Sequence, residues 1–164
     1  MLNKALFLSL ILTLLGLLYY FTIQIVYKAK QKINAEVAVS QIPNFSQKRG
    51  LLKNNTPSIF IAFHPECEHC QYEAKNINEK QKELESLNII LFTSANDSIT
   101  QAFSKTYGLN TLKNVHIVID STNEMRRLFD IKGIPTVFIY NAQNQLVKRF
   151  NGETKIEAIL KYTQ

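Results

Sequence analysis

The chain has 164 residues, of which 46% are hydrophobic, and carries a formal net charge of +6. That length suits one globular domain, and the apolar fraction is large enough to fill its core. The excess positive charge lies before residue 56, because residues 56–164 contain 12 basic and 12 acidic side chains. A neutral domain offers no phosphate-binding surface, so we expect no nucleic-acid partner.

Residues 5–27 form an uninterrupted run without a charged side chain, rich in Leu and Ile and bounded by Lys4 and Lys28. A helix needs roughly 20 apolar residues to cross a bilayer, so we expect a transmembrane anchor after a short segment, residues 1–4. A cleaved signal peptide is the alternative, but its apolar region is about 7 to 15 residues long. The longer run, followed directly by lysines, favours the anchor.

The next stretch, residues 28–57, is polar and basic, with Lys28, Lys30 and Lys32 at its start. We interpret it as a tether between the anchor and a domain at 58–164. Lysines beside a span can meet anionic headgroups, although a strict count of positive charge would place the domain in the cytoplasm. We nevertheless expect the domain to face outward from a bacterial cytoplasmic membrane.

From residue 58 onwards, short apolar runs that predict strands alternate with segments whose apolar residues share a helical face. Strands are predicted at 58–63, 89–93, 115–119, 136–140 and 146–150. Helices are predicted after residue 70 and at 99–107, 125–129 and 155–162. The last two strands are separated only by a turn-rich segment, which predicts a hairpin. The order β-α-β-α-β-α-β-β-α predicts an α/β sandwich of parallel strands with an antiparallel hairpin at one edge.

The helix after Cys70 is predicted to be amphipathic. Ala74, Ile77, Leu84 and Leu87 fall on one helical face. Lys and Glu residues occupy the other face, so we expect the charged side chains to lie opposite the packed surface.

The two cysteines of the chain, Cys67 and Cys70, lie between a predicted strand and a predicted helix. Their spacing lets the two thiols close a small disulfide ring. A helix N-terminus places unpaired N–H groups and positive potential beside the first sulfur, which favours the Cys67 thiolate as the attacking species in thiol–disulfide exchange. Cys70, one turn into the helix, is expected to be more buried and to remain a thiol until it resolves a mixed disulfide.

Three neighbours of the cysteines are candidates for redox tuning: Glu66, Glu68 and His69. An imidazole at His69 can stabilise the first thiolate, which favours the reduced form and raises the reduction potential. A negative charge at Glu68 acts in the opposite direction. The net sign of their combined effect stays open.

The sequence Phe-His-Pro-Glu-Cys-Glu-His-Cys at 63–70, together with Gly-Ile-Pro-Thr at 133–136 before the hairpin, resembles the thioredoxin superfamily. The added helix and strand within 99–120, and Ile-Pro-Asn-Phe at 42–45, are more similar to its TlpA-type membrane-tethered reductases, which are related to peroxiredoxins. The resemblance covers about residues 42–162. It implies a three-layer α/β sandwich with a central mixed sheet, preceded here by one transmembrane helix.

The resemblance also implies roles for individual residues. Cys67 corresponds to the nucleophile and Cys70 to the resolving thiol. Pro135 corresponds to a proline that faces the motif after a cis peptide bond, and Ile134 to the residue whose backbone binds the substrate chain. The implied function is reduction or exchange of disulfides in exported proteins, often for cytochrome c assembly, with an upstream electron donor that the sequence does not identify.

The chain departs from the family pattern at two positions. Glu66 replaces the tryptophan usual before the first cysteine, and Ile61 stands where many thioredoxins carry a buried acid. Proton transfer to and from Cys70 then lacks its usual partner. Glu66 and Glu68, acting through water, are the candidate substitutes.

Two other functions compete with disulfide exchange. A metal site is the first, because Cys-x-x-Cys occurs in zinc ribbons. However, only His64, His69 and His116 remain as further His or Cys donors, and His116 is in a predicted strand. We therefore expect no metal and no cofactor, with a copper-binding assembly module as the remaining metal alternative. The second is a peroxiredoxin-like peroxidase, but Cys67 lacks the threonine of the Pro-x-x-x-Thr-x-x-Cys pattern.

Overall fold

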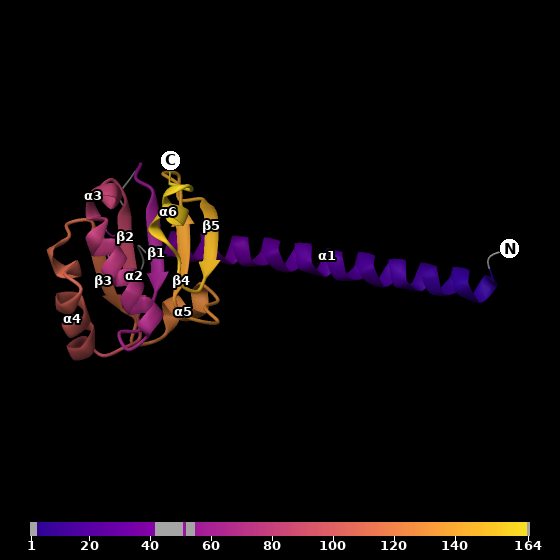
Figure 1. Ribbon diagram of the computed structural model, residues 1–164, viewed down its shortest axis with the longest axis horizontal. Coiled ribbons are helices and arrows are strands. Elements are labelled where there is room, and N and C mark those ends of the chain that lie inside the picture. The colour runs from indigo at the N-terminus through magenta and orange to yellow at the C-terminus, as the bar shows by residue number, and fades with distance from the viewer. Residues whose placement is uncertain (1–2, 42–50, 52–54, 164) are drawn as a thin grey trace. The chain divides into compact units, whose positions relative to one another are not determined.

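The computed structural model describes residues 3–41, 51 and 55–163 of the chain. The chain divides into two compact units, Met1–Ile33 and Asn34–Gln164, and each is described by itself. Figure 1 labels their helices and strands.

The N-terminal helix α1 spans Lys4–Gln41. Within it, Leu6–Ile33 is long and apolar enough to cross a membrane, judged by length and composition. The hydroxyls of Ser9, Thr13 and Thr22 donate to main-chain carbonyls three residues earlier, at 2.8–2.9 Å. These polar groups are therefore satisfied within the helix, as an apolar environment requires.

Helix α1 extends further than the apolar run alone predicts. Residues 28–41, expected at the start of a tether, continue the helix. The sequence gives a reason, because no proline or glycine interrupts it between Gly16 and Pro43. Positions 42–50 and 52–54 of the expected tether lie outside the described residues.

The second unit is built on a five-stranded sheet in the order β3-β2-β1-β4-β5. Strand β1 pairs in parallel with β2, and β2 with β3, whereas β4 is antiparallel to both β1 and β5. This arrangement confirms the predicted mixed sheet with an antiparallel hairpin at one edge. The strands are β1 Ser58–Ala62, β2 Asn88–Thr93, β3 Val115–Ile119, β4 Thr136–Tyr140 and β5 Leu146–Asn151.

Helices cover both faces of this sheet, which confirms the three-layer sandwich (Figure 1). They are α2 Glu68–Glu79, α3 Gln81–Leu84, α4 Asp97–Thr106, the 3-10 helix η2 Leu109–Thr111, α5 Glu124–Leu128 and α6 Ile156–Leu160. The helix predicted after the cysteines is interrupted at Lys80, whose backbone leaves the helical region at φ −104° and ψ 25°. Its apolar face is therefore shared between α2 and α3.

Alternate residues of each strand point to opposite faces, so the sheet has two separate apolar clusters. The aromatic cluster lies on the α5 face and consists of Phe60, Ala62, Ile90, Phe92, Val118, Met125, Phe129, Ile131, Phe138 and Tyr140. The thiol-side cluster lies against the other helices and consists of Ile59, Ile61, Phe63, Cys70, Ala74, Ile77, Leu84, Leu87, Ile89, Leu91, Phe103, Leu109, Val137, Ile139, Ile156 and Ile159.

The strand register brings three loops to the same end of the central strands. Ala62, at the end of β1, pairs with Phe92 near the end of β2 and with Thr136 at the start of β4. Three segments therefore meet at this end of the sheet: the loop from β1 to the cysteines, the turn after β2 and the loop that contains Pro135. The residues singled out in the sequence belong to these loops and to the start of α2.

Candidate active site

Cys67 is the N-cap residue of α2, with an extended backbone at φ −85° and ψ 116° and no hydrogen bond from its side chain to the helix. Its N–H donates to the His64 carbonyl at 3.1 Å, and its carbonyl accepts from the Gln71 N–H at 2.9 Å. The sulfur therefore lies at the helix N-terminus, where unpaired N–H groups create positive potential. This is the placement that the sequence predicts.

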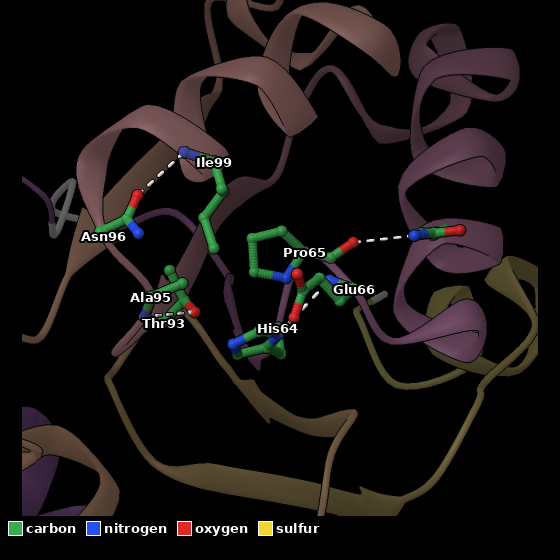
Figure 2. A network of polar contacts seen from close by, with 8 residues as sticks. His64, Pro65, Glu66, Thr93, Ala95, Asn96 and Ile99 are labelled. Atoms are coloured by element: carbon green, nitrogen blue, oxygen red, sulfur yellow. Dashed lines mark hydrogen bonds and ion pairs between the residues drawn. The ribbon is translucent and has the colours of Figure 1, made fainter.

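Two further hydrogen bonds hold the loop before Cys67. The Gln71 side-chain amide donates to the Pro65 carbonyl at 2.9 Å, and the Glu66 N–H donates to His64 Nδ1 at 3.3 Å. Figure 2 shows this loop next to the β2–α4 turn, where Asn96 caps α4. The loop that carries the first cysteine is thus held by hydrogen bonds within itself and from α2.

The two cysteines are free thiols with different surroundings. Cys67 is partly exposed, whereas only 2% of Cys70 is accessible to solvent. Burial raises the pKa of the Cys70 thiol well above its usual range, and the hydrogen bond that it donates to Cys67 raises this pKa further. Cys70 is therefore held as a neutral thiol, as expected from its place in the helix.

A buried carboxyl group, Glu73, lies one helical turn after Cys70. Only 2% of Glu73 is exposed, and burial raises its pKa to about 8. The Thr154 N–H donates to Oε1 at 2.9 Å, which partly offsets that shift. Oε2 has no hydrogen-bond partner within the described part of the chain. The charge of Glu73 also contributes to the raised pKa of Cys70, so the two groups interact electrostatically.

Glu73 was not among the acids expected beside Cys70, which were Glu66 and Glu68. The Glu66 side chain is 78% exposed, and Glu68 is also exposed. The sequence did contain a signal for Glu73, because Cys70, Glu73 and Ile77 follow the spacing of one helical face. All three are buried in α2. Glu73 is thus an acid inside the apolar stripe of α2 and not on its charged face.

His69 is 70% exposed, and its Nδ1 lies 2.7 Å from Oε2 of Glu153, in the loop between β5 and α6. The imidazole thus has a charged partner that the local sequence did not reveal. Glu66, Glu68 and His69 all lie around the cysteine pair, as their positions in the motif require. Their influence on the reduction potential stays a prediction.

The Ile134–Pro135 peptide bond is cis, as predicted. Ala62 pairs with Thr136, so the proline loop lies at the same end of the sheet as the loop that leads to Cys67. Ile134 and Cys67 both pack against the thiol-side cluster. Ile134 also lines a cavity of about 30 Å³ together with His64, Thr93 and Arg126. Neither cysteine lines this cavity.

The structure separates the three histidines that were considered as metal donors. His64 precedes the motif, His69 belongs to it, and His116 is in β3. Within residues 3–41, 51 and 55–163, no three His, Cys, Asp or Glu side chains are grouped so that they could hold a metal ion.

A partly exposed cysteine at a helix N-terminus, a buried partner one turn later and a mixed sheet of this order together define a thioredoxin-like redoxin. Within that class, the chain belongs to the AhpC/TSA family, which residues 30–149 match. A comparison with curated protein sequences finds no significant match.

Solved structures of similar fold include proteins of different redox chemistry. StoA from Bacillus subtilis superposes with a TM-score of 0.57 at 22% identity, over 68% of this chain and 85% of StoA. A secreted Mycobacterium tuberculosis disulfide oxidoreductase homologous to Escherichia coli DsbE gives 0.54 at 17% identity, over 62% and 73%. The Xanthomonas campestris bacterioferritin comigratory protein, described for alkyl peroxide reduction, gives 0.55 at 15% identity, over 66% and 78%. These similarities establish the fold.

Proposed function

We propose that the protein is a membrane-anchored thiol–disulfide oxidoreductase that exchanges disulfides of exported proteins through Cys67 and Cys70. The observation that carries this proposal is the asymmetry of the two thiols. Cys67 is accessible at the start of α2, whereas Cys70 is buried and its pKa is raised. Exchange requires one exposed attacking thiolate and one protected thiol that acts second.

The reaction follows from this division of roles. The Cys67 thiolate attacks one sulfur of the substrate disulfide, and the substrate S–S bond breaks to release a thiolate that takes a proton from solvent. Cys70 then loses its proton and attacks Cys67 Sγ in the mixed disulfide, which releases the second substrate thiol. The substrate gains two electrons, and the Cys67–Cys70 pair becomes a disulfide. An external thiol donor must reduce that disulfide before the next cycle.

Glu73 is the candidate acceptor for the proton of Cys70. It lies three residues after Cys70 on the same buried face, and its charge acts on the Cys70 pKa. A carboxyl whose pKa is about 8 is present in both protonation states near neutral pH. We propose that Glu73 takes the proton in the resolving step and returns it when the disulfide is reduced again.

The neighbouring residues complete the proposed site. Glu68 and His69, with Glu66 before them, would tune the stability of the Cys67 thiolate by their charges. Ile134 and Pro135 would form one wall of the substrate groove, because Ile134 packs against the same cluster as Cys67. An extended substrate chain could then pair with the backbone of Ile134.

A trapping experiment tests the proposed chemistry. Replacing the resolving thiol, Cys70→Ser, should cause covalent adducts to accumulate on Cys67 in cells and to disappear on reduction. Cys67→Ser is the matched control and should form none. Adducts with exported cysteine-rich proteins or apocytochromes would support the proposed substrates. No adducts together with tight Cu(I) binding would identify a copper module, and rapid oxidation of Cys67 by hydroperoxide would identify a peroxidase.

We further propose that residues 5–27 anchor the protein in a bacterial cytoplasmic membrane, that residues 28–57 connect the anchor to the domain, and that the domain, residues 58–164, faces outward. The apolar segment Leu6–Ile33 supports the anchor. A C-terminal alkaline phosphatase fusion should be active in this orientation. An inactive phosphatase fusion and a fluorescent C-terminal GFP fusion would place the domain in the cytoplasm and contradict the proposal.

A further inference from the structure

Two adjacent residues of the loop between β5 and α6 contact the first turns of α2. Glu153 Oε2 lies 2.7 Å from His69 Nδ1, and the Thr154 N–H donates to Glu73 Oε1 at 2.9 Å. His69 immediately precedes Cys70, and Glu73 lies one turn after it. The loop therefore contacts α2 on both sides of the resolving cysteine.

The same loop is also hydrogen-bonded to the loop that contains Pro135. The Gly152 N–H donates to the Pro135 carbonyl at 2.7 Å, and Thr154 Oγ1 donates to the Gly152 carbonyl at 3.0 Å. Gly152 has φ +93°, in the region that favours glycine. The loop thus connects the proline loop with the helix that carries the cysteines.

We propose that Glu153 is a positioning residue for the resolving step: by binding His69, it holds the loop so that the Thr154 N–H stays on one oxygen of Glu73 and leaves the other oxygen available to exchange a proton with Cys70. This inference rests on the proposed function, in which Glu73 receives that proton. Glu153 itself contacts neither the cysteines nor the substrate in this scheme.

The loop acts on Glu73 in two opposite ways. The hydrogen bond from the Thr154 N–H lowers the pKa of Glu73, whereas the charge of Glu153 raises it. Both effects are smaller than that of burial, which places this pKa at about 8. On its own helix, Glu73 faces Cys70, with which it interacts electrostatically. Burial therefore sets the main shift of the Glu73 pKa, and the position of the loop adjusts it.

The opposite effects provide two informative variants. Glu153→Gln removes the charge but keeps an oxygen that can accept a hydrogen bond from His69, so it should lower the pKa of Glu73. His69→Ala keeps the charge of Glu153 but removes its partner, so the Thr154 N–H should leave Glu73 and its pKa should rise. A general loss of stability would not lower the pKa of Glu73 in one variant and raise it in the other.

Glu157→Gln is the matched control. Glu157 forms an ion pair with Lys80 that also joins α2 to α6 on the surface, away from the cysteines. Like Glu153→Gln, this variant removes one negative charge, and it also weakens one contact between α2 and the C-terminal part of the chain. It should leave the titration of Glu73 and the resolving step unchanged.

The test uses the full-length reduced protein in detergent and 5,5′-dithiobis(2-nitrobenzoate). Attack by Cys67 releases one thionitrobenzoate, and resolution by Cys70 releases a second, so stopped-flow absorbance separates the two steps. The second rate is measured against pH, and the Glu73 carboxyl is followed in parallel by carbon-13 NMR. We expect the midpoints of the rate profile and of the Glu73 titration to move down in Glu153→Gln and up in His69→Ala. Each shift should be about half a pH unit.

Three results would overturn the inference. The first is a pair of shifts in the same direction or no shift, and the second is a Glu157→Gln profile that moves like Glu153→Gln. The third is a kinetic shift without a change in the Glu73 titration. Each leaves the proposed disulfide exchange by Cys67 and Cys70 intact if the wild-type protein releases both thionitrobenzoates. A wild-type protein that releases none would overturn the proposed function and this inference together.

Discussion

The two faces of the central sheet differ in what they bury. On the aromatic-cluster face, Phe129 lies with its ring centroid 5.7, 5.5 and 4.9 Å from those of Phe60, Phe92 and Phe138. On the thiol-side face, the helix that packs against the sheet buries Cys70 and the carboxyl of Glu73. One face is filled by apolar contacts, whereas the other includes buried ionisable groups.

This difference separates stability from chemistry. Apolar burial on the aromatic-cluster face stabilises the fold independently of pH. Burial of an ionisable carboxyl stabilises only its neutral form and becomes unfavourable when the group ionises. We therefore expect substitutions on the two faces to differ in how much they change the free energy of unfolding and in how that change depends on pH.

The largest expected change in stability is on the aromatic-cluster face. Phe129→Ala should lower the free energy of unfolding by about 3–5 kcal/mol, because it removes a fully buried ring and leaves a cavity. The loss should be similar at pH 5 and pH 9. Denaturant unfolding of the full-length protein in detergent, followed by near-ultraviolet circular dichroism, measures it.

Tyr72→Ala is the control for that substitution, since Tyr72 is exposed on α2. It should change the free energy of unfolding by less than about 0.5 kcal/mol. The thiol reactivity of Cys67 in the folded fraction should be the same in both variants. A change in reactivity only in Phe129→Ala would show that the two faces are not independent.

On the thiol-side face, we expect Glu73→Gln to change how stability depends on pH. The pKa of Glu73 is raised from 4.5 to about 8 in the folded protein. Below pH 4.5 the carboxyl is protonated in both the folded and the unfolded state, so its ionisation does not yet lower the free energy of unfolding. Between pH 4.5 and 8 the unfolded state ionises first, so the free energy of unfolding falls. Above pH 8 that loss is complete.

Glu73→Gln removes this titration and can still accept the hydrogen bond from Thr154. Relative to wild type, its free energy of unfolding should therefore increase by roughly 3–5 kcal/mol between pH 4 and pH 9. Denaturant unfolding of both reduced proteins at each pH measures the difference. A difference that does not change with pH would contradict the raised pKa of Glu73.

The fold was largely predictable because its strands are continuous apolar runs with turn residues between them. Strands β3 Val115–Ile119 and β4 Thr136–Tyr140 have the bounds that the sequence predicts. The end of α1 and the interruption at Lys80 were not predicted. The end of α1 follows the sequence in one respect, because Gln41 lies two residues before Pro43. No glycine or proline marks the interruption at Lys80.

Only part of the site could be derived from the sequence. The cysteine pair and Pro135 were recognisable because they belong to short motifs. Glu73 was missed because a charged side chain was assigned to the polar face of α2. Glu153 and Thr154 were missed for a different reason: their contacts with α2 join residues more than 80 positions apart, and local patterns contain no information about such pairs.

The smallest expected effect concerns Thr136, where the two faces meet. Its hydroxyl donates to the Gly133 carbonyl at 2.7 Å, and Ile134 in the same loop packs against both clusters. Thr136→Val removes the hydrogen bond with little change in volume and should lower the free energy of unfolding by only about 1 kcal/mol. Because the bond fixes the loop beside Cys67, the rate of disulfide exchange should fall as well. Thr136→Ser keeps the hydroxyl and should restore the rate, whereas an exchange rate that is unchanged in Thr136→Val would separate this loop from the chemistry.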